Sequence, residues 1–485
     1  MAVVFLLWNG DANATPLSVN DISSFTTGDL VISTVSNVSN DSVGLDTASP
    51  ITLQEFQLGS NGTNASEAGI LTLPQVASGN NSAISGEYGS ASEGILQQSV
   101  NGQYLTMMGY GVNANAFNNA PLSTYGTAAL GQTTSLTGQT ATTVPRVVAL
   151  IGANGSVNTS TALTGVFNEN NPRSATTVDG TSFYVAGQGA SKTDTTQGVF
   201  YTTLGSSTAT AIDNSTDARV ATIINTGNGN ELYVSRDFNP PGSGSQNFTN
   251  VSTLTNASGG LPTSATGLVT THITPPASPL SSGGNNGSIN LTASLANGVN
   301  NGRIGSFVYL SPEQFFLASP TVMYVADSGQ PKNGNANKAA LGEGGLQKWV
   351  LTNGIWTLDY DLVDGLDLVN NADADSNTPT APGVTGLFGL TGEVVGDTVE
   401  LFATSYGLNE LSPSYLYEIT DTLSDTTISQ ASSEQFTTLF AADADTSIRG
   451  VAFAPTPTPE PGTMLLMGLG LAGAAFMRKR MLSAN

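Results

Sequence analysis

Cysteine is absent from this chain of 485 residues, and histidine occurs once, as His272. Without thiols the chain can form no disulfide, thiolate nucleophile, zinc–cysteine site or iron–sulfur cluster. A single imidazole also excludes a multi-histidine metal centre within one chain. These absences remove whole classes of redox, thiol and metal chemistry, and we expect no cofactor apart from the calcium considered below.

Charge is scarce as well. Asp, Glu, Lys and Arg make up 10% of the chain, whereas a soluble domain usually carries about 25%. The 36 acidic residues outnumber the 13 basic ones and give a formal net charge of -23. An acidic chain repels the phosphate backbone, so no nucleic-acid partner is expected. The predicted surface is polar, sparsely charged and net negative, which suits a protein outside the cell.

Residues 1–14 predict a secretory signal peptide. An apolar run, Met1–Trp8, precedes Ala12-Asn13-Ala14, which fits a small-x-small cleavage site. The basic segment that normally opens such a signal is missing, because the first Lys or Arg is Arg146. Either the signal is atypical or the true start lies upstream. A buried first strand is the alternative, and export is the interpretation we favour.

The C-terminus predicts a membrane tether. A Pro-rich spacer at 455–461 is followed by an apolar segment of about 16 residues, slightly short of the usual span of about 20. Arg478, Lys479 and Arg480 then form a basic cluster that stays on the cytoplasmic side and stops transfer. Residues 462–485 are therefore expected to be a single transmembrane helix with a basic tail, holding the chain at the inner membrane.

This tail resembles the PEP-CTERM sorting signal of Gram-negative bacteria that make extracellular polysaccharide. The Pro459-Glu460-Pro461 motif, the Gly- and Leu-rich segment and the basic terminus occur in the expected order. The resemblance implies processing by an exosortase and release to the cell surface or matrix. An ordinary membrane anchor is the alternative and gives the same topology. Either way, the tail determines where the protein goes and does not indicate what it does there.

The body, residues 15–454, is predicted to be all-β. Short β-branched and aromatic runs alternate with Gly, Asn, Asp and Ser clusters, which is the pattern of strands and turns. One kind of strong run recurs along the body, with shorter runs before and after it. The strong runs are Asp29–Ser33, Tyr104–Met108, Ser182–Ala186, Glu231–Ser235, Val322–Ala326 and Glu400–Thr404.

Recurrence at intervals of about 50 to 90 residues predicts the blades of a β-propeller. We count six blades, with a seventh if the longest expected loop, Phe238–Arg303, conceals one. Pairing Ile448–Ala454 with Leu30–Ser33 would close the ring and remove two sheet edges. The pattern resembles bacterial β-propeller repeats, without a recurring Trp-Asp or Gly-His signature. A sandwich or two separate β-domains is the alternative.

No catalytic constellation stands out. A Ser-His-acid triad would need His272, and the chain has no Gly-x-Ser-x-Gly motif to pair with it. The segment Gly187–Thr193 superficially resembles a phosphate-binding loop, but Ala186 and Ser191 stand where the two required glycines should be, and no helix pattern follows. We interpret it as a turn.

Acidic loops supply weak calcium candidates. Asn371, Asp373 and Asp375 place oxygen ligands at alternate positions, which suits a hard cation. Ser376 stands where an EF-hand loop needs glycine and Pro382 where it needs glutamate, so the pattern fails twice. A plain solvated loop is the alternative. The acidic residues leading into this loop are Asp359, Asp361, Asp364 and Asp367, and a shorter fragment is Asp443-Ala-Asp445.

Three functions remain open. The favoured one is an exported structural or interaction module of the cell surface or matrix, with exopolysaccharide or matrix proteins as partners. The second is a polysaccharide hydrolase or lyase that uses carboxylates at the mouth of the propeller. The third is a glycan-binding module, which requires Trp349 or Trp356 to face outward, whereas tryptophans on strands more often lie in the core. A cluster of carboxylates in the central channel would favour the enzyme, whereas a channel of Ser, Thr and Gly would favour the module.

Overall fold

In this computed structural model, the structure describes residues 20–457 except 38–45, 60–61, 91, 192, 237–249, 273–287, 291–306, 310–311, 330–343, 367, 369–382 and 408–411. The expected signal peptide, the Pro-Glu-Pro motif, the transmembrane segment and its basic cluster lie outside the described residues, as do the calcium candidates Asn371, Asp373 and Asp375. Within the described residues, no helix is long and apolar enough to cross a membrane.

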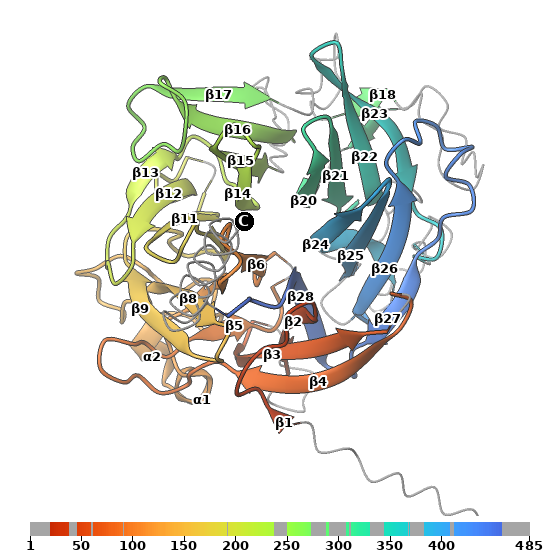
Figure 1. Cartoon of the computed structure of the whole chain (residues 1–485). Coiled ribbons are helices and arrows are strands. Elements are labelled where there is room, and N and C mark those ends of the chain that lie inside the picture. Colours follow the sequence, from red (N-terminus) through yellow and green to blue (C-terminus); the bar gives the residue numbers. More distant parts are fainter. Residues whose placement is uncertain are drawn as a thin grey trace, which may run out of the picture.

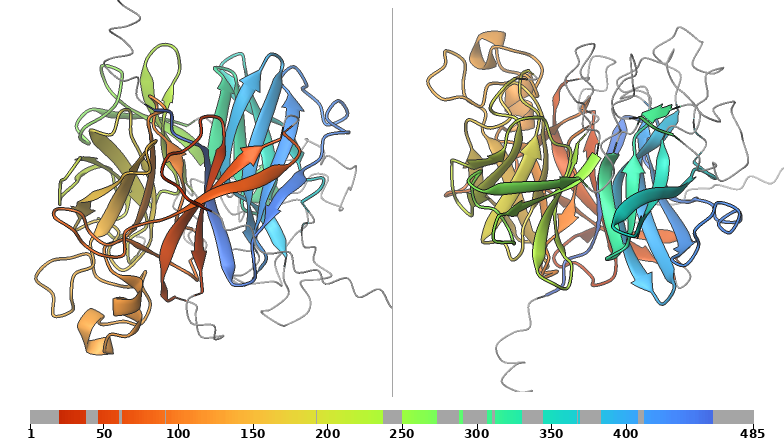
Figure 2. Two further views of the ribbon diagram at one scale, coloured as in Figure 1. Left: turned by 60° about the horizontal axis from the view of Figure 1, so that its bottom comes forward. Right: turned by 90° about the horizontal axis from the view of Figure 1, so that it is seen from above.

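The described chain is all-β, with sheets set around a common centre in a propeller-like arrangement (Figure 1). The described part has two short helices, α1 (Ala114–Asn118) and α2 (Leu122–Tyr125). Figure 2 shows both of them projecting away from the sheets. The predicted fold class is therefore confirmed at the level of an all-β, propeller-like chain.

Four of the sheets have four strands each, and in each sheet the strands follow chain order as an antiparallel meander. They are β10 (Pro172–Thr176), β11 (Ser182–Gly187), β12 (Gly198–Thr203) and β13 (Thr210–Asp213); β14 (Ala221–Asn225), β15 (Asn230–Arg236), β16 (Asn250–Asn256) and β17 (Leu268–His272); β20 (Pro312–Ser319), β21 (Val322–Asp327), β22 (Gly345–Thr352) and β23 (Ile355–Leu362); and β24 (Val384–Val395), β25 (Thr398–Gly407), β26 (Tyr415–Thr422) and β27 (Thr437–Ala441).

A further sheet has ten strands and contains two runs of four, β28-β2-β3-β4 and β6-β7-β8-β9. The short strand β5 joins the two runs, pairing with β3 and, through Ser85 and Tyr110, with β7. A separate two-stranded sheet consists of β18 (Ser288–Asn290) and β19 (Phe307–Tyr309). The strands of the ten-stranded sheet are β1 (Asn20–Asp21), β2 (Leu30–Ser36), β3 (Ala48–Leu58), β4 (Ala65–Thr72), β5 (Ser85–Glu87), β6 (Gln97–Gln98), β7 (Tyr104–Tyr110), β8 (Arg146–Gly152), β9 (Val157–Leu163) and β28 (Thr446–Phe453).

The first long strand and the last strand of the described chain pair with each other. β2 and β28 run antiparallel, with Leu30 opposite Phe453 and Ser36 opposite Thr446. Figure 1 shows the red β2 and the blue β28 side by side. The predicted closure of the ring by these two segments is confirmed, and it pairs the two strand edges that would otherwise lie open.

Each of the six strong runs in the sequence forms one strand. In its row of four strands, this strand is the second from the centre. These strands are β2, β7, β11, β15, β21 and β25. Their side chains are buried on both faces, since each strand lies between two partners and each sheet between two neighbours. A strand in this position needs a continuous apolar run, and this explains why these six segments are the most visible in the sequence.

The long loop expected at Phe238–Arg303 is wrong as a single loop. Two strands, β16 and β17, form within it and complete the sheet that β14 and β15 begin. Val251 and Leu254 of β16 are fully buried. Only these two apolar residues occur in β16, with Ser252 and Thr253 between them, so the strand was obscured by a composition rich in Ser, Thr and Asn. The third strand in this stretch, β18, pairs with β19.

The ring closure predicts a large difference between two valines. Val451 of β28 is fully buried against β2, whereas Val395, beside a hairpin turn, is 55% exposed. Val451→Ala should lower the free energy of unfolding by about 2 kcal/mol, because it leaves a cavity at the closing pair. Val395→Ala should change it by less than about 0.5 kcal/mol. Equal losses in chemical denaturation would contradict the closing role of β28.

Candidate functional site

The centre of the ring is filled by apolar side chains. Ile95, Val220 and Phe388 form one buried cluster with Tyr406, and none of the four is more than 3% exposed. Ile95 lies just before β6, Val220 just before β14, and Phe388 within β24. Because these innermost segments belong to three different sheets, their contact closes the centre with hydrocarbon.

Two glutamines tie the innermost strands together around this apolar cluster. The Gln97 side-chain amide donates to the backbone oxygens of Ala175 at 2.9 Å and Ala221 at 2.8 Å, and so links three sheets. Gln314 accepts from the Leu390 N–H at 2.9 Å and donates to the Leu96 oxygen at 3.4 Å. These bonds hold the inner strands at fixed separations, so the centre is a packed core.

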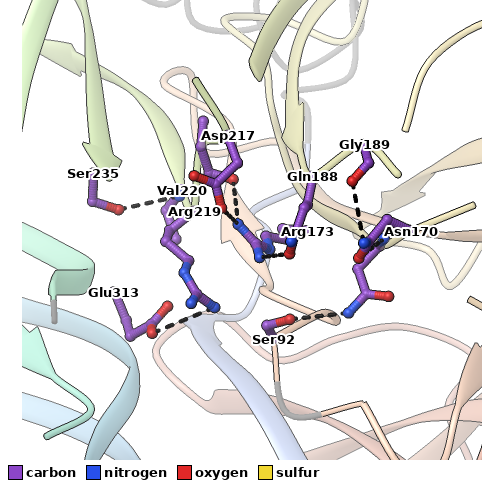
Figure 3. A network of polar contacts seen from close by, with 12 residues as sticks. Ser92, Asn170, Arg173, Gln188, Gly189, Asp217, Arg219, Val220, Ser235 and Glu313 are labelled. Carbon is purple, nitrogen blue, oxygen red and sulfur yellow. Dashed lines mark hydrogen bonds and ion pairs between the residues drawn. The ribbon is translucent and has the colours of Figure 1, made fainter. Parts of the chain in front are cut away.

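Three arginines occupy related positions in the inner layer. Arg173 lies on β10, Arg219 directly before β14, and Arg449 on β28, and all three are nearly fully buried. Figure 3 shows the first two close together, each with its own carboxylate partner. Burial lowers the pKa of Arg173, and the neighbouring positive charge of Arg219 lowers it further.

The partners of these arginines come from neighbouring segments. Arg173 Nη1 lies 2.9 Å from Asp217 Oδ2 and 3.1 Å from the Ala218 oxygen, and Arg173 Nη2 donates to Gln188 Oε1. Arg219 Nη1 lies 3.8 Å from Glu313 Oε1 on β20. A buried charge is tolerated when it is paired and hydrogen-bonded, so these contacts fix the order of sheets around the centre.

A pair of buried glutamates faces the third arginine. The Glu87 N–H donates to Glu93 Oε1, and Arg449 Nη2 donates to the backbone oxygen of Tyr88 at 2.8 Å. Burial raises the pKa of Glu93 to about 7, although the hydrogen bond from Glu87 and the charge of Arg449 lower it. Burial, followed by the charge of Glu93, raises the pKa of Glu87 well above its ordinary value. This is the most perturbed carboxylate pair near the centre.

The space beside this pair is too small for a sugar. The cavity lined by Glu93, Arg449, Ser33 and Met107 has a volume of about 10 Å³, whereas small-molecule sites usually measure about 300 Å³ or more. A second hollow, between Tyr406, Ser412 and Arg449, measures about 30 Å³. These spaces suit a few water molecules.

The described acidic residues among those singled out in the sequence do not form a metal site. Asp361 is buried on β23 close to Asp327, and burial followed by that neighbouring charge raises its pKa well above its ordinary value. Asp443 and Asp445 are exposed. In the described ranges no three His, Asp or Glu side chains are grouped so that they could hold a metal ion. Asp367 lies outside those ranges.

The structure also places the tryptophans, the histidine and the glycine-rich segment that the sequence singled out. Trp349 is 1% exposed, and its indole donates to Gln347 Oε1 at 3.0 Å, so the idea that it faces outward is wrong. Trp356 is half-buried on β23. His272 is the last residue of β17. Gly187 ends β11 and leads into a bend where Asp194 accepts the Ala190 N–H, which confirms the turn.

Sequence reasoning missed the polar residues around the centre: Glu87, Glu93, Arg173, Asp217, Arg219, Glu313 and Arg449. A signal for three of them exists in the sequence. Arg173-Ser-Ala, Arg219-Val-Ala and Arg449-Gly-Val each place an arginine ahead of small or β-branched residues. These three runs were recognised as short strands, but the arginine that recurs in them, in a chain with 13 basic residues, was not recognised as a shared feature of the centre.

The Glu87–Glu93 pair predicts a pH dependence. The folded state holds a proton on Glu93 up to about pH 7, whereas the unfolded side chain loses it near its ordinary pKa of 4.5. The folded state therefore binds more protons in this window, and the free energy of unfolding should fall as pH rises through it. Glu93→Gln should flatten this fall in denaturation curves, and Glu67→Gln, an exposed control, should not. Parallel curves for wild type and Glu93→Gln would contradict the assignment.

Comparison with known proteins adds two results on the body. No curated protein sequence matches the chain. Among solved structures it is similar to a Bombyx mori GH32 beta-fructofuranosidase in complex with sucrose, at 10% identity and a TM-score of 0.29, covering 68% of this chain and 62% of that one. It is also similar to an ancestral GH74 enzyme, at 10% identity and a TM-score of 0.21, covering 82% of this chain and 47% of that one. The chain thus spans less than two thirds of either protein.

The tail gives a clear result. Residues 457–480 match the family of the PEP-CTERM protein-sorting motif. The matched residues include the Pro459-Glu460-Pro461 motif and the basic cluster Arg478-Lys479-Arg480. The resemblance expected from the sequence is confirmed, and the motif implies export to the cell surface and processing by an exosortase. The chain is a propeller-like all-β protein that carries a PEP-CTERM sorting motif at its C-terminus.

Proposed function

We propose that the protein is an exported structural or interaction module of the cell surface or extracellular matrix, delivered by its signal peptide and PEP-CTERM tail. The sorting motif at 457–480 is the observation that carries the proposal. The centre of the ring supports it, since its charged groups are engaged in contacts between sheets. On this view the basic tail tethers the chain at the inner membrane before an exosortase processes it.

We also propose that the body is a six-bladed propeller. The runs β28-β2-β3-β4 and β6-β7-β8-β9 repeat the four-strand order of the four separate sheets. We count them as two blades, which are joined into one sheet by the short pairings of β5 with β3 and β7. This count uses every recurring strong run once and leaves β18 and β19 as a small addition outside the blades.

The distribution of cations supports a partner that is polar and uncharged. Every basic side chain in the described part of the chain is buried, so the charges exposed there are acidic. A neutral polysaccharide, or a protein surface rich in hydroxyls and amides, matches such a surface better than an anionic polymer. The six buried basic residues are Arg146, Arg173, Arg219, Arg236, Lys348 and Arg449.

A polysaccharide hydrolase or lyase is the second candidate. Glu87 and Glu93 favour it, because acid–base cleavage of a glycoside needs two neighbouring carboxyl groups, one of them protonated as the acid, and a raised pKa can supply that acid. The small cavity beside them weighs against it.

A glycan-binding module remains a variant of the first proposal, with half-buried Trp356 as its one tryptophan candidate. Calcium at Asn371, Asp373 and Asp375 also stays a prediction.

The sorting role predicts a change in location. Replacing Pro459, Glu460 and Pro461 with alanine should abolish exosortase processing and leave the chain at the inner membrane, whereas deleting 459–485 should release it untethered. Fractionation and immunoblotting in a host with an exosortase would measure both. Thr458→Ala is the neighbouring control and should leave sorting intact. Identical fractionation of all variants would contradict the proposal.

The surface predicts binding that salt does not weaken. The purified full chain should co-sediment with a neutral exopolysaccharide equally well at ionic strengths of about 0.02 M and about 0.5 M, because no exposed cation of the described body contributes. It should release no reducing sugar. Loss of binding at high salt, or in a chain with Lys332 and Lys338 changed to Gln, would point to a cationic contact. Release of reducing ends that Glu93→Gln abolishes would favour the enzyme.

A further inference from the structure

A buried lysine and aspartate meet where two neighbouring sheets pack together. Lys348 lies on β22 and Asp421 on β26, and both side chains are fully buried. Lys348 Nζ is 2.8 Å from Asp421 Oδ2. The surrounding cluster is apolar and aromatic, with Tyr417, Ala431 and Phe436 among its members. The nucleophilic nitrogen and the carboxyl group are thus held in contact and shielded from solvent.

Two tyrosines orient the carboxyl group of Asp421. The Tyr360 hydroxyl donates to Asp421 Oδ1 at 2.6 Å, and the Tyr324 hydroxyl donates to Oδ2. Lys348 Nζ in turn donates to the Tyr360 oxygen at 2.8 Å and to the backbone oxygens of Thr422 at 2.7 Å and Asp425 at 2.8 Å. Each reacting group therefore has one orientation, which is how a protein raises the effective concentration of two reactants.

A third acidic side chain lies beside the pair. Burial, together with its hydrogen bond to Asp421, raises the pKa of Glu434 to about 9. Glu434 is therefore a neutral carboxylic acid at physiological pH, and it can both give and take a proton next to Asp421. The Thr422 N–H donates to Glu434 Oε1 at 3.3 Å and fixes its position.

We propose that Lys348 and Asp421 condense into an amide, an intramolecular isopeptide bond between β22 and β26, with Glu434 as the acid–base group. A proton passes from the ammonium of Lys348 to the carboxylate, giving a neutral amine and a carboxylic acid. The nitrogen attacks Asp421 Cγ and forms the C–N bond. Glu434 gives its proton to the departing hydroxyl and takes one from the nitrogen. The C–O bond breaks and one water leaves, so no oxidant or co-reactant is needed.

The environment favours the product. Condensation replaces two buried charges with a neutral amide and so removes the desolvation cost of a buried ion pair. The amide oxygen can keep the hydrogen bond from Tyr360, and the amide N–H can keep one to the Thr422 or Asp425 oxygen. In a chain without cysteine, such a bond is a covalent link between sheets that needs no thiol.

Intact-mass spectrometry of the full chain tests the proposal. The wild-type protein should be about 18 Da lighter than its sequence mass, because one water is lost. Peptide mapping with an acid-specific protease should yield one branched peptide that joins the segments containing Lys348 and Asp421. A wild-type mass equal to the sequence mass would overturn the proposal and leave the pair as an ion pair.

Three variants assign the chemistry. Lys348→Arg and Glu434→Gln should both show their full sequence mass, the first because the nucleophile is gone and the second because the proton relay is gone. Lys338→Arg is the matched control and should keep the loss of water. Because the bond forms only in the folded chain, circular dichroism should first show that Glu434→Gln folds, and a folded Glu434→Gln chain that still loses one water would contradict the role of Glu434. A loss that persists in Lys348→Arg comes from elsewhere in the chain and would overturn the assignment.

Discussion

Burial of cations at the joins between sheets is the constraint on which the rest of this structure depends. A buried charge costs several kcal/mol unless its partners are in place, so each such residue fixes the segments around it. Arg236 Nη2 lies 2.7 Å from Asp213 Oδ2 and so connects β15 to β13 of the preceding sheet. Arg173, Arg219 and Lys348 make comparable links between segments of adjacent sheets. Removing one partner would leave the other uncompensated, so the charges specify which sheet follows which.

The same constraint explains why the centre is closed. The arginine side chains of the inner layer have protein acceptors in place of water, so the cluster of Ile95, Val220 and Phe388 can pack beside them and exclude bulk water. The glutamates that face Arg449 lie within the same packed layer, so their raised pKa values have burial as their first cause. Perturbed carboxyl groups often indicate catalysis, and in this pair burial beside Arg449 is the physical cause of the shifts.

The sequence revealed most clearly the strands that carry continuous apolar runs, and it revealed the shorter strands on either side of them only in part. The second strand of each four-strand run was visible because it is buried on both faces. The innermost strand β6 has only two residues, Gln97 and Gln98, and its contacts are polar, so no hydrophobic pattern marks it. The strand β16 was hidden in a Ser- and Thr-rich stretch. The ring closure could be predicted because two orphan segments matched each other.

The polar sites could not be predicted for a different reason. Lys348 and Asp421 meet because the register of two hairpins and the packing of two sheets place them together. Neither the register nor the packing can be inferred from the residues next to them in the sequence. Trp349 and its neighbour Lys348 point to opposite faces of β22, and both are buried because a sheet packs against each face. Local patterns therefore identify strands, whereas the side chains that meet between sheets require the three-dimensional structure.

The buried cations have a further consequence for a protein that works outside the cell. Trypsin-like proteases cut after lysine or arginine and must draw an extended segment around that residue into their active site. In the part of the chain that the structure describes, each such residue lies in or directly beside a buried strand. A protease of this class would find no substrate there until the sheets had opened, so the lifetime of the described body among such secreted enzymes is set by how rarely it unfolds.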